Sequence, residues 1–397
     1  MSLPSLYLRR RHERRVQRGH PWVFSNEVAI ERSPLTAFQA GDCVNVASYS
    51  GKLLGTAYVN PHSLICARLL SPEADRVLDE ELLGERLAHA LALRERLGWL
   101  PHCRLVYGES DRIPGLIVDR YGDVLVVQIG TAGMERVRDD IVRTLVKLCR
   151  PAAVVLRNDL TSRGLEGLES YVEIAHGEVP TVVGLRENGA SFEISPLEGQ
   201  KTGWYYDHRR NRARLSHHSE GRSVLDCFSY VGGFGIQAAI GGARSALCLD
   251  SSESALARLS RNAELNGVAG RVDGRRGDVF DSLRDLRSEQ RRFDIVVVDP
   301  PAFMRRKKDR RAGIEAYRRL NRRAMQVLED DGLLLSASCS FHLSPEEHQD
   351  IVAGAAADVG RWVQILERGH QAADHPVHPG LPESEYLKAL LVRVCRY

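Results

Sequence analysis

The second half of the chain alternates apolar, strand-like runs with helical segments, and this alternation constrains the fold more than any other feature. Strands are expected at 223–227, 245–249, 271–276, 294–298 and 332–337, with a late pair near 361–367 and 387–394. Helical periodicity fills gaps at 253–266, 311–329 and 345–358. Such alternation is typical of a parallel sheet covered on both faces, which binds ligands at the carboxyl ends of its strands. We therefore predict an α/β, Rossmann-like domain over 186–397.

The first of these strands leads into a glycine-rich loop. Asp226 ends the strand, and after a short spacer Gly232 and Gly233 open a helix. Asp250 ends the next strand, where a carboxylate can accept hydrogen bonds from both hydroxyls of a ribose. Asp278 follows the third strand and is expected to meet the amine of an adenine. Because glycine lets a backbone approach a ligand closely, the pattern predicts a cofactor that contains adenosine.

Two cofactors compete for this loop. The run Gly233-x-Gly235-x-x-Ala238 fits the dinucleotide pattern GxGxxA, with an acid 12 residues later, which would make the protein a dehydrogenase. In dinucleotide sites, however, the first glycine follows the strand almost at once, whereas here Asp226 and five further residues intervene. A helix N-terminus suits a pyrophosphate, but the sulfonium cation of S-adenosylmethionine (SAM) tolerates Asp226. We therefore predict SAM as the cofactor and S-adenosylhomocysteine (SAH) as its product.

The fourth strand ends in Asp299-Pro300-Pro301-Ala-Phe303, which we call the DPP loop. Two prolines cannot continue a hydrogen-bonded ladder, so they make a stiff loop that fixes the Asp299 side chain. A flat base could lie beside Phe303 while Asp299 contacts its polar edge. The loop therefore suits methylation of a nucleobase or a planar amide, although a merely rigid strand exit is the alternative.

Cys339 follows the fifth strand, at the same expected edge of the sheet. Carbon 5 of a pyrimidine is a poor nucleophile, but a thiolate that adds to carbon 6 makes carbon 5 reactive toward a methyl group. A base must then remove the proton on carbon 5. Basic neighbours promote ionisation of the thiol, and Arg305 to Lys308 are expected nearby. The alternative for Cys339 is a buried structural cysteine, and His342 is either a proton carrier or a surface histidine.

Basic side chains gather in two segments. Six arginines lie within the first 18 residues against one acid, and ten basic residues lie within 305–323 against two acids. Such clusters are typical of proteins that bind polyanions, although a solvated helix face is the alternative. The residues expected to contact RNA phosphates are Arg9, Arg10, Arg11, Arg14, Arg15, Arg305, Arg306, Lys307 and Lys308.

The first 185 residues differ in pattern from the rest. Strand-like runs at 43–48, 55–60 and 64–70 predict a small β domain over 1–75, preceded by a basic helix at 9–19. Residues 76–185 predict an α+β domain with helices at 78–97 and 134–149 and strands at 115–119, 124–129 and 153–157. No catalytic constellation occurs in residues 76–185, and the candidate catalytic residues all lie in 186–397.

Composition excludes several classes of protein. None of the eight cysteines forms a CxxC pair, so no zinc site is predicted, and no metal is expected. No run of about 18 apolar residues occurs, which argues against a membrane span. The N-terminus lacks the apolar stretch of a signal peptide, so free thiols and a cytoplasmic location are expected.

Several motifs together resemble one known family over nearly the whole chain. They are Gly19-His-Pro-Trp-Val-Phe-Ser-Asn-Glu27, Gly108-Glu-Ser-Asp-Arg-Ile-Pro-Gly-Leu-Ile-Val-Asp-Arg-Tyr-Gly122, Gly199-Gln-Lys-Thr-Gly-Trp-Tyr-Tyr-Asp-His-Arg-Arg-Asn-Arg212, the cofactor loop, Asp299-Pro-Pro and Ser338-Cys339-Ser340. With these motifs the chain resembles the RlmI-type cytosine-5 methyltransferases of large-subunit ribosomal RNA. The resemblance implies an RNA-binding PUA barrel at 1–75, a central domain at 76–185 and a class I SAM-dependent methyltransferase domain at 186–397. A homodimer is also expected on this ground.

The resemblance also implies roles for individual residues. Cys339 would be the nucleophile, and Asp299 would orient the target base, with Pro300, Pro301 and Phe303 beside it. The SAM pocket would comprise Asp226, Phe228, Ser229, Gly232, Gly233, Asp250, Ser251, Asp278 and Val279, with Lys201, Thr202, Tyr206 and Arg212 near it. The family usually has glutamine where His208 stands, so a direct role for position 208 is not expected.

The leading hypothesis is therefore a SAM-dependent enzyme that forms 5-methylcytosine in 23S ribosomal RNA through a covalent bond between Cys339 and carbon 6. Large-subunit ribosomal RNA is the expected partner, and no membrane is expected. Methylation of a base amine at the DPP loop is an enzymatic alternative in which Cys339 is structural. An RNA-binding factor for ribosome assembly is the non-enzymatic alternative.

Overall fold

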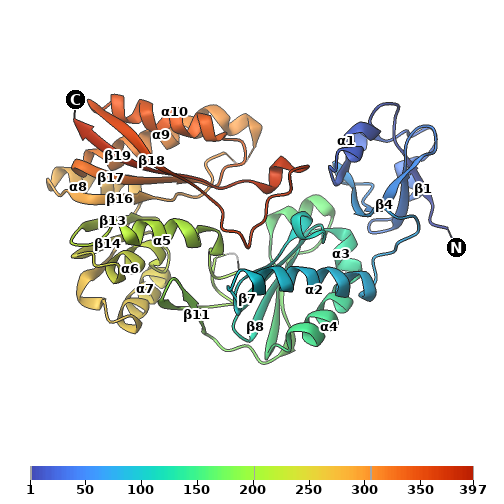
Figure 1. The fold of residues 1–397 in the computed structure, drawn as a ribbon, viewed down its shortest axis with the longest axis horizontal. Helices are drawn as coiled ribbons and strands as arrows, with labels where there is room; N and C mark the ends of the chain where they lie inside the picture. Colours follow the sequence, from blue (N-terminus) through green and yellow to red (C-terminus); the bar gives the residue numbers. More distant parts are fainter. Residues whose placement is uncertain (1, 201, 305, 397) are drawn as a thin grey trace. The chain divides into compact units, whose positions relative to one another are not determined.

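A computed structural model describes residues 2–200, 202–304 and 306–396 of the chain. The contacts divide the chain into two compact units, drawn in Figure 1. Unit 1 comprises Met1–Val183, Ser195–Tyr206 and Ala373–Ser384, and unit 2 comprises Gly184–Ile194, Asp207–Ala372 and Glu385–Tyr397. The domain boundaries predicted at 75 and 185 stay predictions. Among the described residues, no helix is both long enough and apolar enough to cross a membrane.

Unit 1 begins with a five-stranded sheet in the order β1-β3-β4-β5-β2. Its strands are β1 (Ser5–Tyr7), β2 (Trp22–Phe24), β3 (Cys43–Ala47), β4 (Leu53–Val59) and β5 (Ile65–Ser71). The basic helix expected at 9–19 is shorter, because only α1 (Glu13–Gln17) is helical. The backbone N–H of Arg9 donates to the Glu27 carbonyl, and Arg11 has a φ of 71°. A helix cannot pass through that left-handed position, so it starts beyond it.

A second sheet of unit 1 has the order β10-β9-β8-β7-β6. Its strands are β6 (His102–Tyr107), β7 (Leu116–Tyr121), β8 (Val124–Ile129), β9 (Ala153–Asn158) and β10 (Tyr171–Gly177), and α2 (Glu80–Arg96) packs against it. The sequence analysis missed β6 and β10. The helix expected at 134–149 is two helices, α3 (Ala132–Arg136) and α4 (Arg138–Cys149), because Val137 has a φ of −106° and interrupts the helical backbone.

Unit 2 contains a seven-stranded sheet in the order β15-β14-β13-β16-β17-β19-β18. Its strands are β13 (Ser223–Cys227), β14 (Ser245–Asp250), β15 (Val272–Arg276), β16 (Phe293–Val298), β17 (Leu328–Ser338), β18 (Arg361–His370) and β19 (Lys388–Arg396). The five strands β13 to β17 run parallel, and β19 is antiparallel to both neighbours. A short hairpin of β11 (Val183–Glu187) and β12 (Ala190–Ile194) precedes this sheet. The predicted α/β fold is confirmed.

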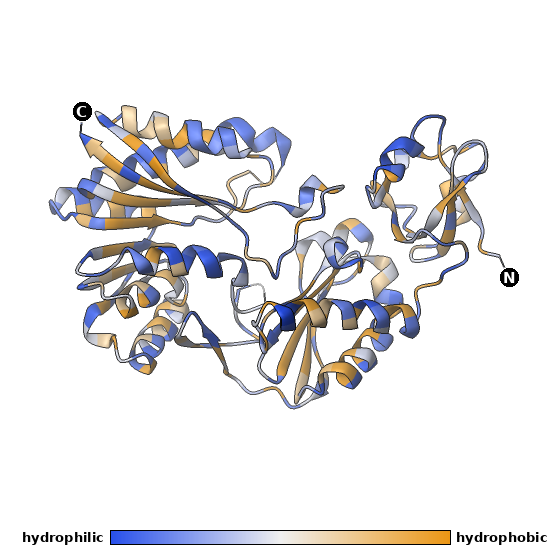
Figure 2. Cartoon of the chain, in the orientation of Figure 1, coloured by the Kyte–Doolittle hydropathy of each residue, from blue (hydrophilic) through white to orange (hydrophobic). Residues whose placement is uncertain are grey.

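Helices form two layers around this sheet. One layer consists of α5 (Arg209–His217), α6 (Gly233–Ile240) and α7 (Glu253–Leu265), and the other of α8 (Val279–Ser288), α9 (Arg310–Gln326) and α10 (Pro345–Ala357). Figure 2 shows the apolar strands between them. Helix α9 ends earlier than expected, because the chain enters β17 at Leu328 rather than at 332. Strand β13 lies between β14 and β16, so the chain order reverses there, and ligands bind at the carboxyl ends of strands at such a point.

Candidate active site

Asp226 and Asp299 come from adjacent strand ends at this reversal point. Cys227 of β13 is the register partner of Val298 of β16, so the residues at the ends of both strands are neighbours. Asp226 is 1% exposed, and its Oδ2 accepts a hydrogen bond from the Gly235 backbone N–H at 2.9 Å. Its Oδ1 is buried and has no hydrogen-bond partner among the described residues. Burial is the main cause that raises the pKa of Asp226 to about 7, and the nearby charge of Asp299 adds to it.

The loop after Asp226 has an unusual backbone. Phe228 and Tyr230 have φ values of 64° and 51°, in the left-handed region that non-glycine residues rarely adopt. Such strain concentrates at ligand sites, where the surrounding structure enforces it. Gly232 also has a positive φ, of 90°, and a Cβ there would lie 2.8 Å from the Ile236 side chain. A Cβ at Gly235 would lie 2.4 Å from the sulfur of Cys248, so this glycine lets α6 pack closely against β14.

The other predicted cofactor acids have well-defined partners. Asp250 accepts the backbone N–H of Tyr230 on Oδ2 and that of Ser252 on Oδ1, each at 2.8 Å. Each of its oxygens keeps a lone pair that could accept from a ribose hydroxyl. Asp278 is exposed and caps α8 by accepting from the Asp281 N–H at 3.1 Å. Val279 is buried beneath it, and Ser251 is exposed beside Asp250.

These donors and acceptors fit SAM better than a dinucleotide. The loop presents the Oδ1 of Asp226 and the hydroxyl of Ser229, two buried atoms that have no hydrogen-bond partner in the part of the chain that the structure describes. A buried carboxylate oxygen attracts a cation, such as the sulfonium or ammonium group of SAM, and repels a pyrophosphate. When bound, SAM would supply an electrophilic methyl group at this edge of the sheet. Asp226, Ser229 and Asp250 would hold it.

The remaining predicted cofactor residues lie elsewhere. Lys201 lies outside the described residues. Thr202 and Tyr206 belong to unit 1, where the Thr202 hydroxyl donates to Asp119 at 2.5 Å and the Tyr206 hydroxyl donates to the Arg120 carbonyl at 2.8 Å. Their contact with the cofactor stays a prediction.

Arg212 belongs to unit 2 and is buried. Its guanidinium holds both carboxylate oxygens of Glu187, at 2.6 and 3.1 Å. This fork-like ion pair ties α5 to the hairpin β11–β12. The Gln237 side chain of α6 also donates to Glu187, at 3.0 Å, so the same carboxylate links both helices to the hairpin. The structure therefore gives Arg212 a scaffolding contact, and its role toward SAM stays a prediction.

The DPP loop is anchored by aromatic packing. The ring of Phe303 lies 4.7 Å from that of Tyr317 and 6.3 Å from that of Phe280, between centroids. Pro300 is buried and Pro301 is exposed, and Asp299 keeps a quarter of its side chain exposed. The loop therefore presents the Asp299 carboxylate to a ligand at the strand edge.

His208 contacts Asp299 directly, which the sequence analysis did not expect. The His208 Nε2 lies 3.2 Å from the Asp299 Oδ1. The Asn211 amide nitrogen contacts both the His208 Nδ1 at 3.1 Å and the His370 carbonyl at 3.4 Å, so in the neutral ring Nδ1 accepts and Nε2 carries the proton toward Asp299. Burial acts to lower the pKa of His208, but the neighbouring acids, Asp299 first and then Asp207, together outweigh burial, and the pKa is raised.

Hydrogen bonds join the segment around Cys339 to the DPP loop through Tyr317. The Ser338 hydroxyl donates to the Tyr317 hydroxyl at 2.9 Å, and the Ser340 hydroxyl lies 2.8 Å from the same oxygen. The backbone N–H of Met304 contacts the Ser340 hydroxyl at 3.3 Å. Cys339 itself is partly exposed. The backbone N–H of Phe303 donates to the Tyr317 hydroxyl at 3.5 Å, so Tyr317 links the two neighbours of Cys339 to the DPP loop.

Lys388 is a functional candidate that the sequence analysis missed. It opens β19 opposite Ser338 of β17 and is 8% exposed. Its ammonium donates to the carbonyls of Ser340 and Tyr386, each at 2.7 Å. Burial lowers the pKa of Lys388 to about 8, although the neighbouring Cys339 and Glu385 oppose this. A lysine inside the apolar run 387–392 was the available signal, but only the antiparallel return of β19 brings it to Cys339.

His342 and the basic clusters have mixed surroundings. His342 packs against Phe341, with ring centroids 5.4 Å apart. Arg305 lies outside the described residues, and Arg306, Lys307 and Lys308 are exposed.

The N-terminal arginines differ among themselves. Arg11 and Arg14 are exposed, and the Arg10 guanidinium lies 4.8 Å from the centroid of the Tyr49 ring. Arg9 donates to the Val28 carbonyl, and Arg15 pairs with Glu27 at 2.7 Å, so these two already have internal partners. Contacts of all these residues with RNA stay predictions.

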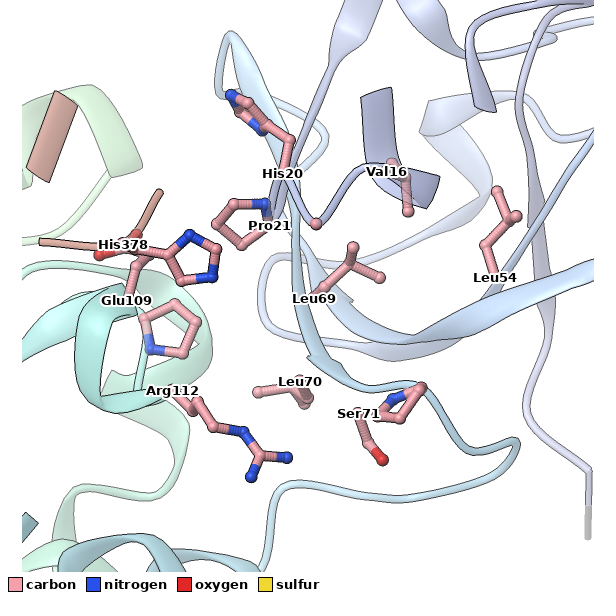
Figure 3. A pocket seen from close by; sticks show the side chains of 13 residues that line it. Val16, His20, Pro21, Leu54, Leu69, Leu70, Ser71, Glu109, Arg112 and His378 are labelled. Atoms are coloured by element: carbon pink, nitrogen blue, oxygen red, sulfur yellow. The ribbon is translucent and has the colours of Figure 1, made fainter. Parts of the chain in front are cut away.

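Unit 1 has a separate cavity of about 200 Å³, shown in Figure 3. Leucines form one side of it, and His20, Glu109, Arg112 and His378 form the other. None of the predicted catalytic or cofactor residues lines it.

Comparison with known proteins identifies the family. An S-adenosylmethionine-dependent methyltransferase family matches residues 114–393, and a PUA-like domain matches residues 6–72. Ribosomal RNA large subunit methyltransferase I of Shewanella denitrificans is 39% identical over 387 residues, which cover 96% of this chain and 97% of that protein. The protein of the same name from Vibrio cholerae is 38% identical over 400 residues, covering 98% and 99%.

A solved structure has the same fold. The crystal structure of SMU.776 complexed with SAH has a TM-score of 0.85 at 21% identity and covers 98% of this chain and 100% of that chain. The predictions of the fold class, the cofactor and the family are thus confirmed. The chain belongs to the ribosomal RNA large subunit methyltransferase I family and is a SAM-dependent methyltransferase with an N-terminal PUA-like domain.

Proposed function

We propose that the protein methylates carbon 5 of a cytosine in large-subunit ribosomal RNA, with Cys339 as the nucleophile. The names of its relatives support the RNA substrate. The observation that carries the proposal is the cluster around Tyr317, which joins the segment of Cys339 to the DPP loop. The cluster holds the residues that flank the Cys339 thiol and the loop that carries the Asp299 carboxylate, and a thiol and a carboxylate are the groups that attack on carbon 6 requires.

In the proposed reaction the Cys339 sulfur forms a bond to carbon 6, and the electron pair of the 5,6 double bond moves to carbon 5. Carbon 5 takes the methyl group that SAM supplies. A base then removes the proton from carbon 5, the double bond forms again, and the bond between sulfur and carbon 6 breaks. Cys339 leaves as a thiolate, and the enzyme returns to its starting state when SAH leaves and the base passes its proton to solvent.

Asp299 and His208 would hold the base in place. The Asp299 carboxylate would accept a hydrogen bond from the 4-amino group of cytosine, which uracil lacks. The Nε2–H of His208, 3.2 Å away, fixes the orientation of that carboxylate. His208 is therefore a positioning residue, which acts through Asp299.

Lys388 would favour the thiolate of Cys339. Its ammonium is held by the carbonyls of Ser340 and Tyr386 beside Cys339, and a nearby cation stabilises a thiolate. His348, the buried histidine next to it, cannot share this role, because burial lowers the pKa of His348 to about 3 and the ring is neutral.

Labelled SAM and unmodified large-subunit ribosomal RNA test the proposal. We expect transfer of label to the RNA, 5-methylcytosine as the product in nucleoside mass analysis, and loss of transfer in Cys339→Ala. An N4-methylcytosine product with full activity in Cys339→Ala would instead support methylation of the base amine. RNA binding with no transfer by the wild-type protein would support an assembly factor.

A further inference from the structure

Unit 2 has a strongly basic cavity that the proposed reaction does not use. Its volume is about 500 Å³, and four arginines but only one acid line it. The arginines are Arg287, Arg292, Arg361 and Arg396, and the acid is Asp358. We call it the arginine pocket. Its composition differs from that of the candidate active site, which is built from carboxylates, a thiol and one lysine.

The arginine pocket lies at the amino edge of the parallel sheet. Arg292 directly precedes β16, and Arg361 opens β18, which runs in the same direction as β17. Arg396 ends the antiparallel strand β19 and so reaches the same edge, while Arg287 lies in the last turn of α8. Cys339 and the cofactor loop follow the carboxyl ends of the strands. Six residues of strand span about 20 Å, so the two sites are separated by at least that length.

The arginines repel one another in the ligand-free protein. Arg361 and Arg396 are direct register partners across β18 and β19, an arrangement of like charges that destabilises a sheet. Arg361 is 8% exposed, and its pKa is lowered by burial and by the charges of Arg292 and Arg396, although Asp330 and Glu329 partly oppose this. The acid of the pocket does not balance them, because Arg318 holds both oxygens of Asp358 at 2.8 and 2.6 Å.

Internal hydrogen bonds orient two of these arginines but do not neutralise their positive charges. Arg361 donates to the carbonyls of Leu328 and Glu329 at 3.0 Å, and Arg292 donates to the carbonyls of Gln326 and Leu328. Neutral carbonyls order these guanidinium groups and leave their charges uncancelled. Within the described ranges, the Arg287 guanidinium has no hydrogen bond or ion pair, and that of Arg396 has only Asp330 at 3.4 Å.

We propose that the arginine pocket binds a backbone phosphate of the RNA substrate, at a nucleotide several positions away from the methylated base. Guanidinium groups bind phosphate oxygens through paired N–H donors, and a bound phosphate would neutralise the facing Arg361 and Arg396. The inference that the phosphate belongs to RNA rests on the proposed function. The inference that the arginine pocket binds a phosphate does not.

The first test measures Tm in inorganic phosphate and in chloride at equal ionic strength. Wild-type protein should gain Tm in phosphate, because a ligand that binds the folded state stabilises it. The double variant Arg287→Gln, Arg396→Gln should lose most of this gain. The control Arg275→Gln, Arg284→Gln removes equal charge from arginines that already pair with Glu289 and Asp281, and it should keep the gain. An equal gain in Tm in all three proteins would show that the arginine pocket does not bind phosphate.

The second test identifies the source of the phosphate. Affinity for a large-subunit ribosomal RNA transcript is measured against salt concentration, with SAM affinity as the check of folding. Each phosphate contact contributes about 0.7 to 0.9 to the logarithmic salt slope, so loss of this one contact should make the double variant bind several-fold more weakly, with a slope smaller by about 0.7 to 0.9. An unchanged slope in a variant that has lost its phosphate response would overturn the assignment to RNA. Neither readout depends on methyl transfer by Cys339. A failure of the proposed chemistry can therefore be distinguished from a failure of the arginine pocket to bind phosphate.

Discussion

The two candidate sites, at opposite edges of the unit 2 sheet, differ in their predominant charge. The carboxyl edge holds Asp226, Asp250 and Asp299, whereas the amino edge holds the four arginines of the arginine pocket. Helix dipoles explain part of this division, because the helices after parallel strands begin at the carboxyl edge and end at the amino edge. Asp278 at the start of α8 and Arg287 in its last turn follow that rule.

The dipole does not explain every charge. Arg361 and Arg396 lie on strands and face each other, and Asp226 is buried with one oxygen unpartnered. Each of these features is unfavourable without a ligand of the opposite charge. The comparison therefore indicates a cation site at one edge and an anion site at the other, which suits an enzyme that combines SAM with RNA.

Lys388 departs from this division, since it is a cation at the carboxyl edge, and among the residues that support Cys339 and Asp299 its removal should lower the rate most. Lys388→Met should lower the rate of methyl transfer by about 100-fold at neutral pH and leave SAM affinity unchanged, because the thiolate loses its counter-charge. In the wild type the rate should fall above about pH 8, where the ammonium loses its proton.

Lys388→Arg provides the matched control. Arginine stays charged at all accessible pH values, so this variant should recover activity and lose the fall above pH 8. Cys339, Glu385 and His348 are the titratable groups next to Lys388, and only the lysine side chain differs between these proteins. The same alkaline fall in Lys388→Arg would show that Lys388 is not its cause.

Asp226 should make SAM affinity depend on pH. Its pKa of about 7 is raised by burial, so the protonated carboxyl stabilises the ligand-free fold at low pH, and this contribution is lost as pH rises through 7. A cationic ligand needs the carboxylate, so SAM affinity should weaken by up to about tenfold per pH unit below 7.

Calorimetry at several pH values measures this dependence. Asp226→Asn should bind SAM weakly with little variation over pH 5 to 8. Asp278→Asn changes an exposed acid that follows another strand, β15, at the same edge of the sheet, and it should keep the wild-type dependence. SAM affinity that is constant with pH in the wild type would argue against contact between Asp226 and the cation.

The contact between His208 and Asp299 should have a smaller effect. His208→Leu removes the donor to the carboxylate and should lower kcat by about tenfold through misorientation of the base. His208→Gln keeps a donor and should stay within a few-fold of the wild type. A steady-state comparison on ribosomal RNA checks both variants, and equal activity in His208→Leu would remove position 208 from the site.

Substitution of Tyr317 should have the smallest effect on the transfer rate of these variants, together with a modest loss of stability. Tyr317→Phe loses the hydroxyl that contacts Ser338 and Ser340, which should lower the free energy of unfolding by about 1 to 2 kcal/mol. Chemical denaturation measures this change. Ser336→Ala, which removes a buried contact with His348 outside the cluster, should leave the transfer rate less affected than Tyr317→Phe does.

The sequence predicts those parts of the site that depend on local pattern. Asp226, Asp299 and Cys339 each follow an apolar strand, so the parallel topology alone brings them to one edge. Lys388 and His208 escape such reasoning, because long stretches of chain separate them from Cys339 and Asp299. Only the folded topology brings each pair together. The helix expected over 134–149 likewise breaks at Val137, where tertiary packing overrides helical periodicity.

The central claim is the covalent bond between Cys339 and carbon 6, and RNA that contains 5-fluorocytosine tests it most directly. Fluorine on carbon 5 cannot leave as a proton, so the methylated adduct cannot release the sulfur. With SAM present, the wild-type protein should form a protein–RNA complex that survives denaturing electrophoresis, and Cys339→Ala should form none. A wild-type enzyme that methylates ordinary RNA but gives no such complex would contradict the account.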